Sequence, residues 1–121
     1  MNNDKLQAQI EKMRSAFVET AESFGARAEF RSELIYPAFM HDEHAEVVQT
    51  AGKALARIGR EMKLVHSGGG SDANIFNGMG VPTINFAIGY EHIHTKKEQI
   101  PVEELVKTAE LVYSIIQTVA E

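Results

Sequence analysis

The amino-acid sequence predicts an α/β (α+β) fold. Three segments carry apolar residues every three or four positions, as amphipathic helices do, and the segments between them are either short and apolar or alternate between apolar and charged residues, as strands do. The chain has 121 residues, of which 44% are hydrophobic and 24% charged, and this composition is typical of a globular domain. A core of helices packed on strands is therefore expected.

The first helix is expected from Leu6 to Phe24, with Gly25 at its end, and a half-buried strand follows over residues 27–36. In this strand apolar and charged residues alternate, so that one face is mostly apolar, and Pro37 ends it. The helix carries its apolar residues at helical spacing: Leu6, Ile10, Met13, Phe17 and Phe24.

The second helix is expected from Asp42, its predicted N-cap, to Ile58. Two short apolar strands are expected beyond it, at residues 62–65 and 81–88, and a helical turn at residues 71–77 separates them. The predicted buried stripe of this helix comprises Val47, Val48, Ala51, Leu55 and Ile58.

The last helix is expected to begin at Pro101, because proline suits the first helical position. Glu103 and Glu104 complement the partial positive charge of the helix start. A polar loop over residues 90–100 precedes this helix. Its predicted buried stripe comprises Leu105, Val106, Ala109, Val112, Ile116 and Val119.

The chain is expected to divide into domains at residues 1–38 and 39–121. The first contains one helix and one alternating strand, whereas the strands of the second are continuously apolar and separated by helices. A lone strand leaves both of its hydrogen-bonding edges open. We therefore expect a homo-oligomer that forms through this exposed strand edge.

Charge and cysteine content exclude several classes of function. There are 12 Lys and Arg against 17 Asp and Glu, which gives a net charge of −5, and no basic cluster is present. Nucleic acid and anionic membranes are therefore not expected as partners. The sequence has no cysteine, which excludes disulfides and thiolate metal sites. No window approaches the roughly 18 apolar residues of a membrane span, and a cytoplasmic location is expected.

The glycine-rich segment Ser67-Gly-Gly-Gly-Ser71 follows a predicted strand and opens a helical turn. Glycines let a ligand approach the backbone closely, and grouped N–H donors favour an anion such as a carboxylate. A flexible turn with Ser71 as its N-cap explains the same residues. Ser71 as a nucleophile, with His66 or His94 as its base, is disfavoured because the segment lacks a Gly-x-Ser-x-Gly elbow.

Two groups of histidines have the spacing of metal ligands. His92 and His94 lie two residues apart, so in an extended segment both imidazoles point to the same side, although loop histidines are usually solvated. The second group, His41-Asp-Glu-His44, lies at a predicted helix start. There the acidic side chains are explained more simply as partners of the helix N–H groups.

Two motifs together resemble the carboxyl-terminal part of a family of di-zinc metallopeptidases. The first is Gly68-Gly-Gly-Ser-Asp-Ala-Asn74 and the second is His94-Thr-Lys-Lys-Glu98, with Gly80-Val-Pro-Thr83 between them. The family is that of tripeptidase T, acetylornithine deacetylase and succinyl-diaminopimelate desuccinylase, and its tripeptidase T-like members are the most similar. The resemblance implies that residues 1–38 belong to a lid or dimerisation domain and residues 39–121 to the carboxyl-terminal βα part of the catalytic domain.

The resemblance also implies site residues. It makes His94 a ligand of one of two zinc ions. The other ligands and the general base are implied to lie in an amino-terminal half that this chain lacks, so no catalytic residue is expected here. The residues implied to bind the substrate are Gly69, Gly70, Ser71 and Asn74.

The function implied by the resemblance is that of a zinc-dependent, tripeptidase-like aminopeptidase, which hydrolyses small peptides with a metal-activated water. This chain corresponds to its carboxyl-terminal part, and we expect the isolated chain to be inactive. The alternative is a non-catalytic, self-associating or anion-binding module built on the loop Gly68-Gly69-Gly70-Ser71.

Overall fold

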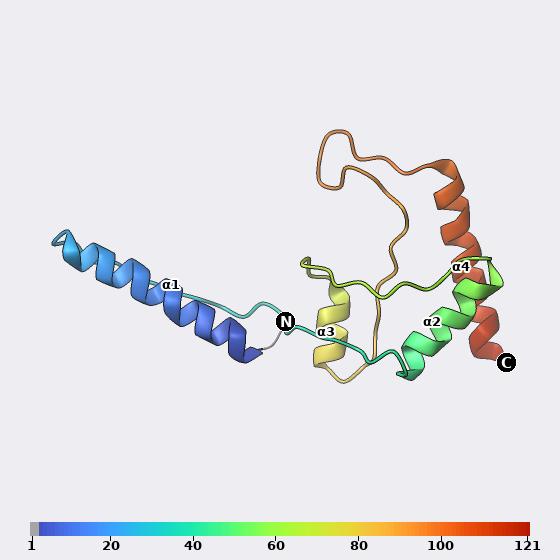
Figure 1. Ribbon diagram of the computed structural model, residues 1–121, viewed down its shortest axis with the longest axis horizontal. Coiled ribbons are helices and arrows are strands. Elements are labelled where there is room, and N and C mark those ends of the chain that lie inside the picture. The colour runs from blue at the N-terminus through green and yellow to red at the C-terminus, as the bar shows by residue number, and fades with distance from the viewer. Residues whose placement is uncertain (1–2) are drawn as a thin grey trace. The chain divides into compact units, whose positions relative to one another are not determined.

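The computed structural model describes residues 3–121 and has four helices among them (Figure 1). They are α1 (Asn3–Ser23), α2 (Glu46–Arg57), α3 (Asp72–Gly78) and α4 (Val102–Ala120). Helices make up 49% of the structure and strands 2%. The predicted α/β (α+β) fold is therefore wrong, because the described part of the chain contains no sheet. Its one isolated antiparallel bridge joins Glu91 and Gln99.

The three predicted strands form irregular chain instead. Residues 27–36, 62–65 and 81–88 have the composition of strands, but a strand is stabilised by hydrogen bonds from a neighbouring strand. Within residues 3–121, none of these segments has such a neighbour. Alternation of apolar and polar residues indicates that one face is buried, and it carries no information about whether a partner is present. The expected helix-plus-strand and βα parts are consequently helices joined by irregular chain.

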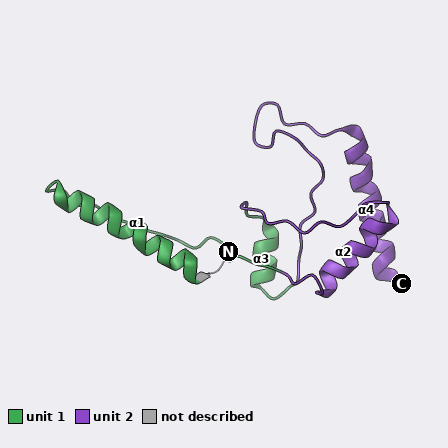
Figure 2. Ribbon diagram, in the orientation of Figure 1, with its two compact units in different colours: residues 1–40, 70–81 green, residues 41–69, 82–121 purple. Residues whose placement is uncertain are grey.

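Contacts divide the chain into two compact units, which Figure 2 shows in different colours. Unit 1 comprises residues 1–40 and 70–81, and unit 2 comprises residues 41–69 and 82–121. The predicted domain boundary after residue 38 stays a prediction, and the first two residues of that predicted domain lie outside the described part.

In unit 1, α1 covers the predicted first helix except Phe24, and Gly25, which follows two residues after its end, has a φ of +69°. The N–H of Ala26 donates to the Ala21 carbonyl at 2.8 Å, and the N–H of Gly25 donates to the Glu22 carbonyl at 2.9 Å, which together form a Schellman motif. The chain then returns along α1, where the rings of Phe17 and Phe30 stack with centroids 5.9 Å apart. This stack holds α1 against residues 27–36, the segment that follows it in the chain.

In unit 2, α2 packs against α4 through small residues. Ala54 is fully buried, and the buried Ser114 hydroxyl donates to the Ala54 carbonyl at 2.8 Å. Two ion pairs flank the contact: Arg57 with Glu121 at 2.7 Å and Arg60 with Glu104 at 2.6 Å. Small side chains allow the helix backbones to approach closely, so a hydroxyl reaches a carbonyl of the neighbouring helix. The buried residues of this contact are Val48, Ala51, Ala54, Leu111 and Ser114.

The buried face of α4 differs from the prediction. Leu111 and Ser114 face inward, whereas the predicted stripe is exposed, from 51% at Val106 to 70% at Val119. The prediction that this apolar stripe is buried is therefore wrong, because α2 packs on the face of α4 that carries Leu111 and Ser114. Neither α4 nor any other helix within residues 3–121 is both long and apolar enough to cross a membrane.

Candidate functional site

The first part of the glycine-rich segment presents bare backbone to solvent. Gly68 and Gly69 are exposed, and a Cβ placed on Gly68 would meet nothing within 4 Å. The N–H of Gly69 donates to the Ser67 hydroxyl at 3.3 Å. These residues belong to unit 2, while the remainder of the segment, from Gly70 onwards, belongs to unit 1. The structure therefore leaves the predicted substrate residue Gly69 open to a ligand.

Gly70 is in contact with a residue far away in the sequence. A Cβ at this position would overlap the Cζ and hydroxyl oxygen of Tyr36 and lie 2.7 Å from its Cε1. A side chain at this position would therefore have to displace the end of the Tyr36 side chain, which is itself 41% exposed. The predicted role of Gly70 in substrate binding stays a prediction.

Ser71 and Asn74 form a capping box at the start of α3. The Ser71 backbone N–H donates to Asn74 Oδ1 at 3.0 Å, and Asn74 Nδ2 donates to the Pro37 carbonyl at 2.8 Å. Asn74 is 8% exposed, and both the oxygen and the nitrogen of its side-chain amide make hydrogen bonds within unit 1. Its side chain connects the segment 36–37 to the glycine-rich turn, and Ser71 acts as the N-cap expected of it.

The histidine loop, residues 90–99, carries the predicted metal ligand. His94 is exposed, and its backbone has φ +60°. His92 lies in the same loop with φ +54°. Gly89, just before the loop, has φ +79° and lies against the Glu104 side chain. A Cβ placed on Gly89 would be 2.8 Å from Glu104 Cγ. Glu104 in turn pairs with Arg60, so the loop starts from the region where α2 ends and α4 begins.

The second group of histidines has structural partners. His41 Nε2 donates to the Thr83 carbonyl at 3.1 Å. The carboxylate of Asp42 accepts the N–H of His44 at 2.8 Å, so it caps a turn and does not cap α2, which begins at Glu46 with Ala45 as its N-cap. The predicted start of this helix was therefore too early. An aspartate stabilises a turn two residues on just as it caps a helix, and sequence alone does not separate the two.

The donor set within residues 3–121 does not make a complete metal site. No three His, Asp or Glu side chains are grouped there as metal ligands would be. A catalytic zinc takes about three protein ligands. The described residues therefore do not by themselves fit a zinc ion, and the role of the exposed His94 as a ligand stays a prediction.

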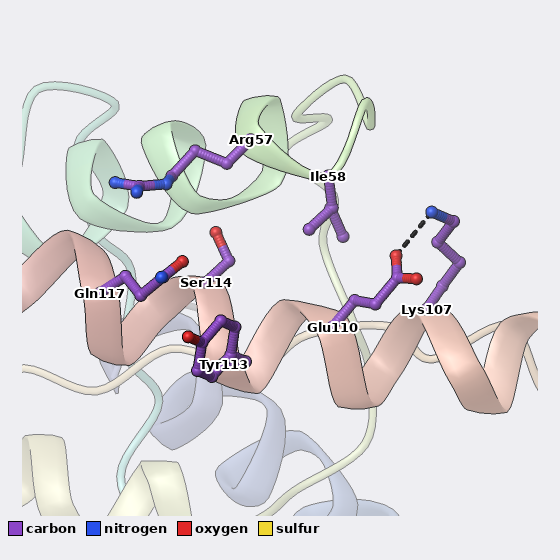
Figure 3. Close-up of a pocket in the computed structure, with 7 residues that line it drawn as sticks. All are labelled: Arg57, Ile58, Lys107, Glu110, Tyr113, Ser114 and Gln117. Atoms are coloured by element: carbon purple, nitrogen blue, oxygen red, sulfur yellow. Dashed lines mark hydrogen bonds and ion pairs between the residues drawn. The ribbon is translucent and has the colours of Figure 1, made fainter.

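A surface groove of about 400 Å³ lies in unit 2 between the end of α2 and one side of α4 (Figure 3). At one end of the groove, Lys107 and Glu110, which both lie on α4, form an ion pair in which Nζ is 2.6 Å from Oε2. None of the predicted site residues lines this groove. Its lining residues are Arg57, Ile58, Lys107, Glu110, Tyr113, Ser114 and Gln117.

Sequence reasoning missed the residues that hold the site segments in place. Tyr36 and Pro37 contact the glycine-rich turn from more than 30 positions away in the chain, and no local pattern indicates such a contact. Sequence reasoning also missed Glu98, whose carboxylate accepts the backbone N–H of His94 at 2.7 Å. Glu98 lies in the quoted histidine motif, and its spacing of four residues from His94 could have indicated this contact.

Comparison with solved structures defines the class of protein. Aminopeptidase PepT from Bacillus cereus ATCC 10987 is 50% identical, with a TM-score of 0.86 over 99% of this chain and 32% of its own. A tripeptidase from Staphylococcus aureus subsp. aureus Mu50 is 34% identical, with a TM-score of 0.91 over 98% of this chain and 32% of its own. Both are peptidases, which are hydrolases.

The chain belongs to peptidase family M20/M25/M40, whose model matches residues 2–118. It is a tripeptidase T-like member, and the resemblance drawn from the two motifs is confirmed. An uncharacterised protein of Bacillus subtilis (strain 168), YqjE, is 52% identical over 98% of this chain and 32% of its own length. The chain thus spans about a third of the length of these relatives. Peptidases of this family are generally metal-dependent.

Proposed function

We propose that residues 1–121 are the part of a zinc-dependent, tripeptidase-like aminopeptidase that supplies one metal ligand and one substrate-binding segment. The observation that carries this proposal is the likeness to a solved aminopeptidase over 99% of the chain at 50% identity. The whole enzyme hydrolyses small peptides. His94 supplies the ligand, and Gly69, Gly70 and Ser71 supply the backbone that the substrate meets.

The geometry of the glycine-rich segment supports this role. Gly68 and Gly69 are exposed and without side chains, so a peptide can approach their backbone closely. Asn74, the fourth predicted substrate residue, has its amide engaged with Ser71 and Pro37. In the proposal it contributes by holding the turn in shape for the substrate.

The donor set limits what this chain does alone. His94 is one ligand, and a metal-activated water requires about two more ligands and a general base. We therefore propose that residues 1–121 alone have no peptidase activity and bind zinc weakly.

A chimera tests both halves of the proposal. Residues 1–121 replace the matching third of the Bacillus cereus aminopeptidase, and tripeptide hydrolysis is measured for the chimera and for the 121-residue chain. We expect the chimera to hydrolyse the tripeptide and the isolated chain to be inactive. His94→Ala in the chimera abolishes hydrolysis, whereas His44→Ala, the matched change at another exposed histidine, preserves it.

Two outcomes contradict the proposal. One is a His94→Ala chimera that retains the activity of the His44→Ala chimera. The other is chelator-sensitive tripeptide hydrolysis by the 121-residue chain. If the chain is inactive and its chimera is also inactive, inorganic phosphate binding by the chain would favour the anion-binding alternative.

We also propose that the chain self-associates through residues 27–36, the segment predicted to be a strand, which forms no strand in the structure. Charges alternate along this segment, and an antiparallel copy centred on Phe30 places Arg27 opposite Glu33 and Glu29 opposite Arg31. Sedimentation of the 121-residue chain is expected to show a concentration-dependent dimer. Reversing Arg27 and Arg31 to Glu places like charges opposite each other and is expected to weaken it. A monomer at all concentrations contradicts this proposal.

A further inference from the structure

Two residues of the histidine loop have a left-handed backbone although they carry side chains. The φ angles of His92 and His94 are +54° and +60°. This conformation crowds the Cβ against the backbone and is uncommon outside glycine, although histidine adopts it more often than most residues. Such strain persists only where the surrounding structure imposes it, and it is concentrated at functional sites. The group that bonds to the His94 backbone lies four residues further along the chain.

The Glu98 carboxylate holds the main chain of His94. The His94 N–H donates to Glu98 Oε2 at 2.7 Å. A hydrogen bond from an N–H to a carboxylate is roughly twice as strong as one between neutral groups. Because the bond is made to the backbone, it fixes the conformation of His94 and occupies neither imidazole nitrogen.

The remainder of the loop is closed by its own hydrogen bonds. The Thr95 hydroxyl and N–H both donate to the His92 carbonyl, at 2.7 and 3.1 Å, and the hydroxyl oxygen accepts the Lys97 N–H at 3.1 Å. At the base, Glu91 and Gln99 exchange backbone hydrogen bonds of 2.8 and 3.2 Å. All of these bonds lie within nine residues, so the loop holds its turn with local partners.

We propose that Glu98 is a positioning residue that sets the backbone of His94 before a metal ion binds. Glu98 acts through the main chain of His94 and does not itself contact the metal. This inference rests on the proposed function for the role of His94, whereas the bond between the two residues needs no metal. Its consequence is that the imidazole is presented with little reorganisation left to occur on binding.

The test compares three variants of the 121-residue chain by NMR. Glu98→Ala removes the acceptor and the charge. Glu98→Gln removes the charge but keeps an oxygen acceptor, so it separates the hydrogen bond from the electrostatic effect of a nearby carboxylate on exchange. Lys96→Ala, at an exposed side chain of the same loop, is the matched control. The readout without metal is the hydrogen-exchange rate of the His94 amide, with helix content from circular dichroism as the check on folding.

We expect exchange at His94 to be at least about tenfold faster in Glu98→Ala, intermediate in Glu98→Gln, whose neutral oxygen accepts a weaker hydrogen bond, and unchanged in Lys96→Ala. Zn²⁺ is then titrated into the metal-free chimera, where the proposed function places the other ligands, and Glu98→Ala is expected to weaken its binding by about tenfold relative to Lys96→Ala. Equal exchange rates in Glu98→Ala and Lys96→Ala overturn the inference. Faster exchange with unchanged Zn²⁺ affinity also overturns it, because the bond would then not prepare the ligand.

Failure of the proposed function is distinguishable. If His94→Ala leaves both the Zn²⁺ affinity and the activity of the chimera unchanged, the role of His94 as a metal ligand is wrong, and the positioning inference falls with it. If the chimera loses activity on His94→Ala but exchange is insensitive to Glu98, only the positioning inference is wrong.

Discussion

The two candidate site segments are held in place in opposite ways. The histidine loop makes its hydrogen bonds within residues 91–99, and the strained backbone of His94 is bonded to a residue only four positions away. The turn from Gly70 to Asn74 is held by Tyr36 and Pro37, more than 30 positions earlier. One segment is therefore shaped by local sequence, and the other depends on a long-range contact that must form when unit 1 folds.

This difference predicts which mutations should have effects far from the substituted residue. A change in the histidine loop is expected to alter that loop and little else, since most of its partners are its neighbours. A change at the glycine-rich turn is expected to release the segment 36–37 and to destabilise unit 1. Three substitutions test this contrast.

Asn74→Ala is expected to have the largest effect. It removes the acceptor of the Ser71 N–H and the donor to the Pro37 carbonyl, both at a nearly buried position. Losing a cap and a long-range hydrogen bond together costs about 2–3 kcal/mol of unfolding free energy, which urea denaturation of the 121-residue chain measures. Asn74→Asp keeps the acceptor for Ser71 and is expected to cost less.

The control for this prediction is Asn77→Ala, because the Asn77 Nδ2 donates to the Ala73 carbonyl within the same helix. If Asn74→Ala is no more destabilising than Asn77→Ala, the contact with Pro37 contributes nothing, and the contrast between the two segments breaks down.

Gly70→Ala is expected to have the next largest effect. The new methyl group would overlap the Tyr36 ring, which must then leave its place. Overpacking of this kind costs about 1–2 kcal/mol where the displaced group is a partly exposed side chain. Gly68→Ala is the matched control, because nothing lies within 4 Å of a Cβ at that position.

A double-mutant cycle shows whether the Tyr36 ring is the cause. Once Tyr36→Ala has removed the ring, Gly70→Ala is expected to cost no more than Gly68→Ala. If its cost is unchanged without the ring, the steric explanation is wrong.

The contrast also explains what the sequence could predict. The helical spacing in α1 and the glycine after it correctly located that helix, because both depend on neighbouring residues. The predicted strands failed because strands need partners that local sequence does not specify. The apolar stripe of α4 was recognised from its spacing, but what packs against a stripe is decided elsewhere, and α2 packs on the face of Leu111 and Ser114 instead.

The candidate site follows the same rule. His94 and the glycine-rich segment were predicted from their motifs, and the chain's family is confirmed by the comparisons. The contact between Tyr36 and Gly70 joins residues 34 positions apart, so no periodicity or spacing in the sequence predicts it. The roles of His94, Gly69, Gly70, Ser71 and Asn74 in binding remain predictions that the chimera tests.

Thr95→Val is expected to have the smallest global effect and a clear local one. It removes the hydroxyl that donates to the His92 carbonyl and accepts the Lys97 N–H. Because both partners lie inside the loop, the unfolding free energy should change by less than about 0.5 kcal/mol, as at most surface positions. Hydrogen exchange at the Lys97 amide should accelerate by about three- to tenfold, since one neutral hydrogen bond is lost.

Thr118→Val provides the control, because the Thr118 hydroxyl donates to the Ser114 carbonyl within α4 and has no connection to the loop. It should leave exchange at Lys97 unchanged. If Thr95→Val lowers the unfolding free energy as much as Asn74→Ala does, the histidine loop supports the fold of unit 2 and is not a locally held segment. If instead only Lys97 and its neighbours respond, the loop keeps its shape through its own bonds, and a residue such as Glu98 can orient His94 without help from distant contacts.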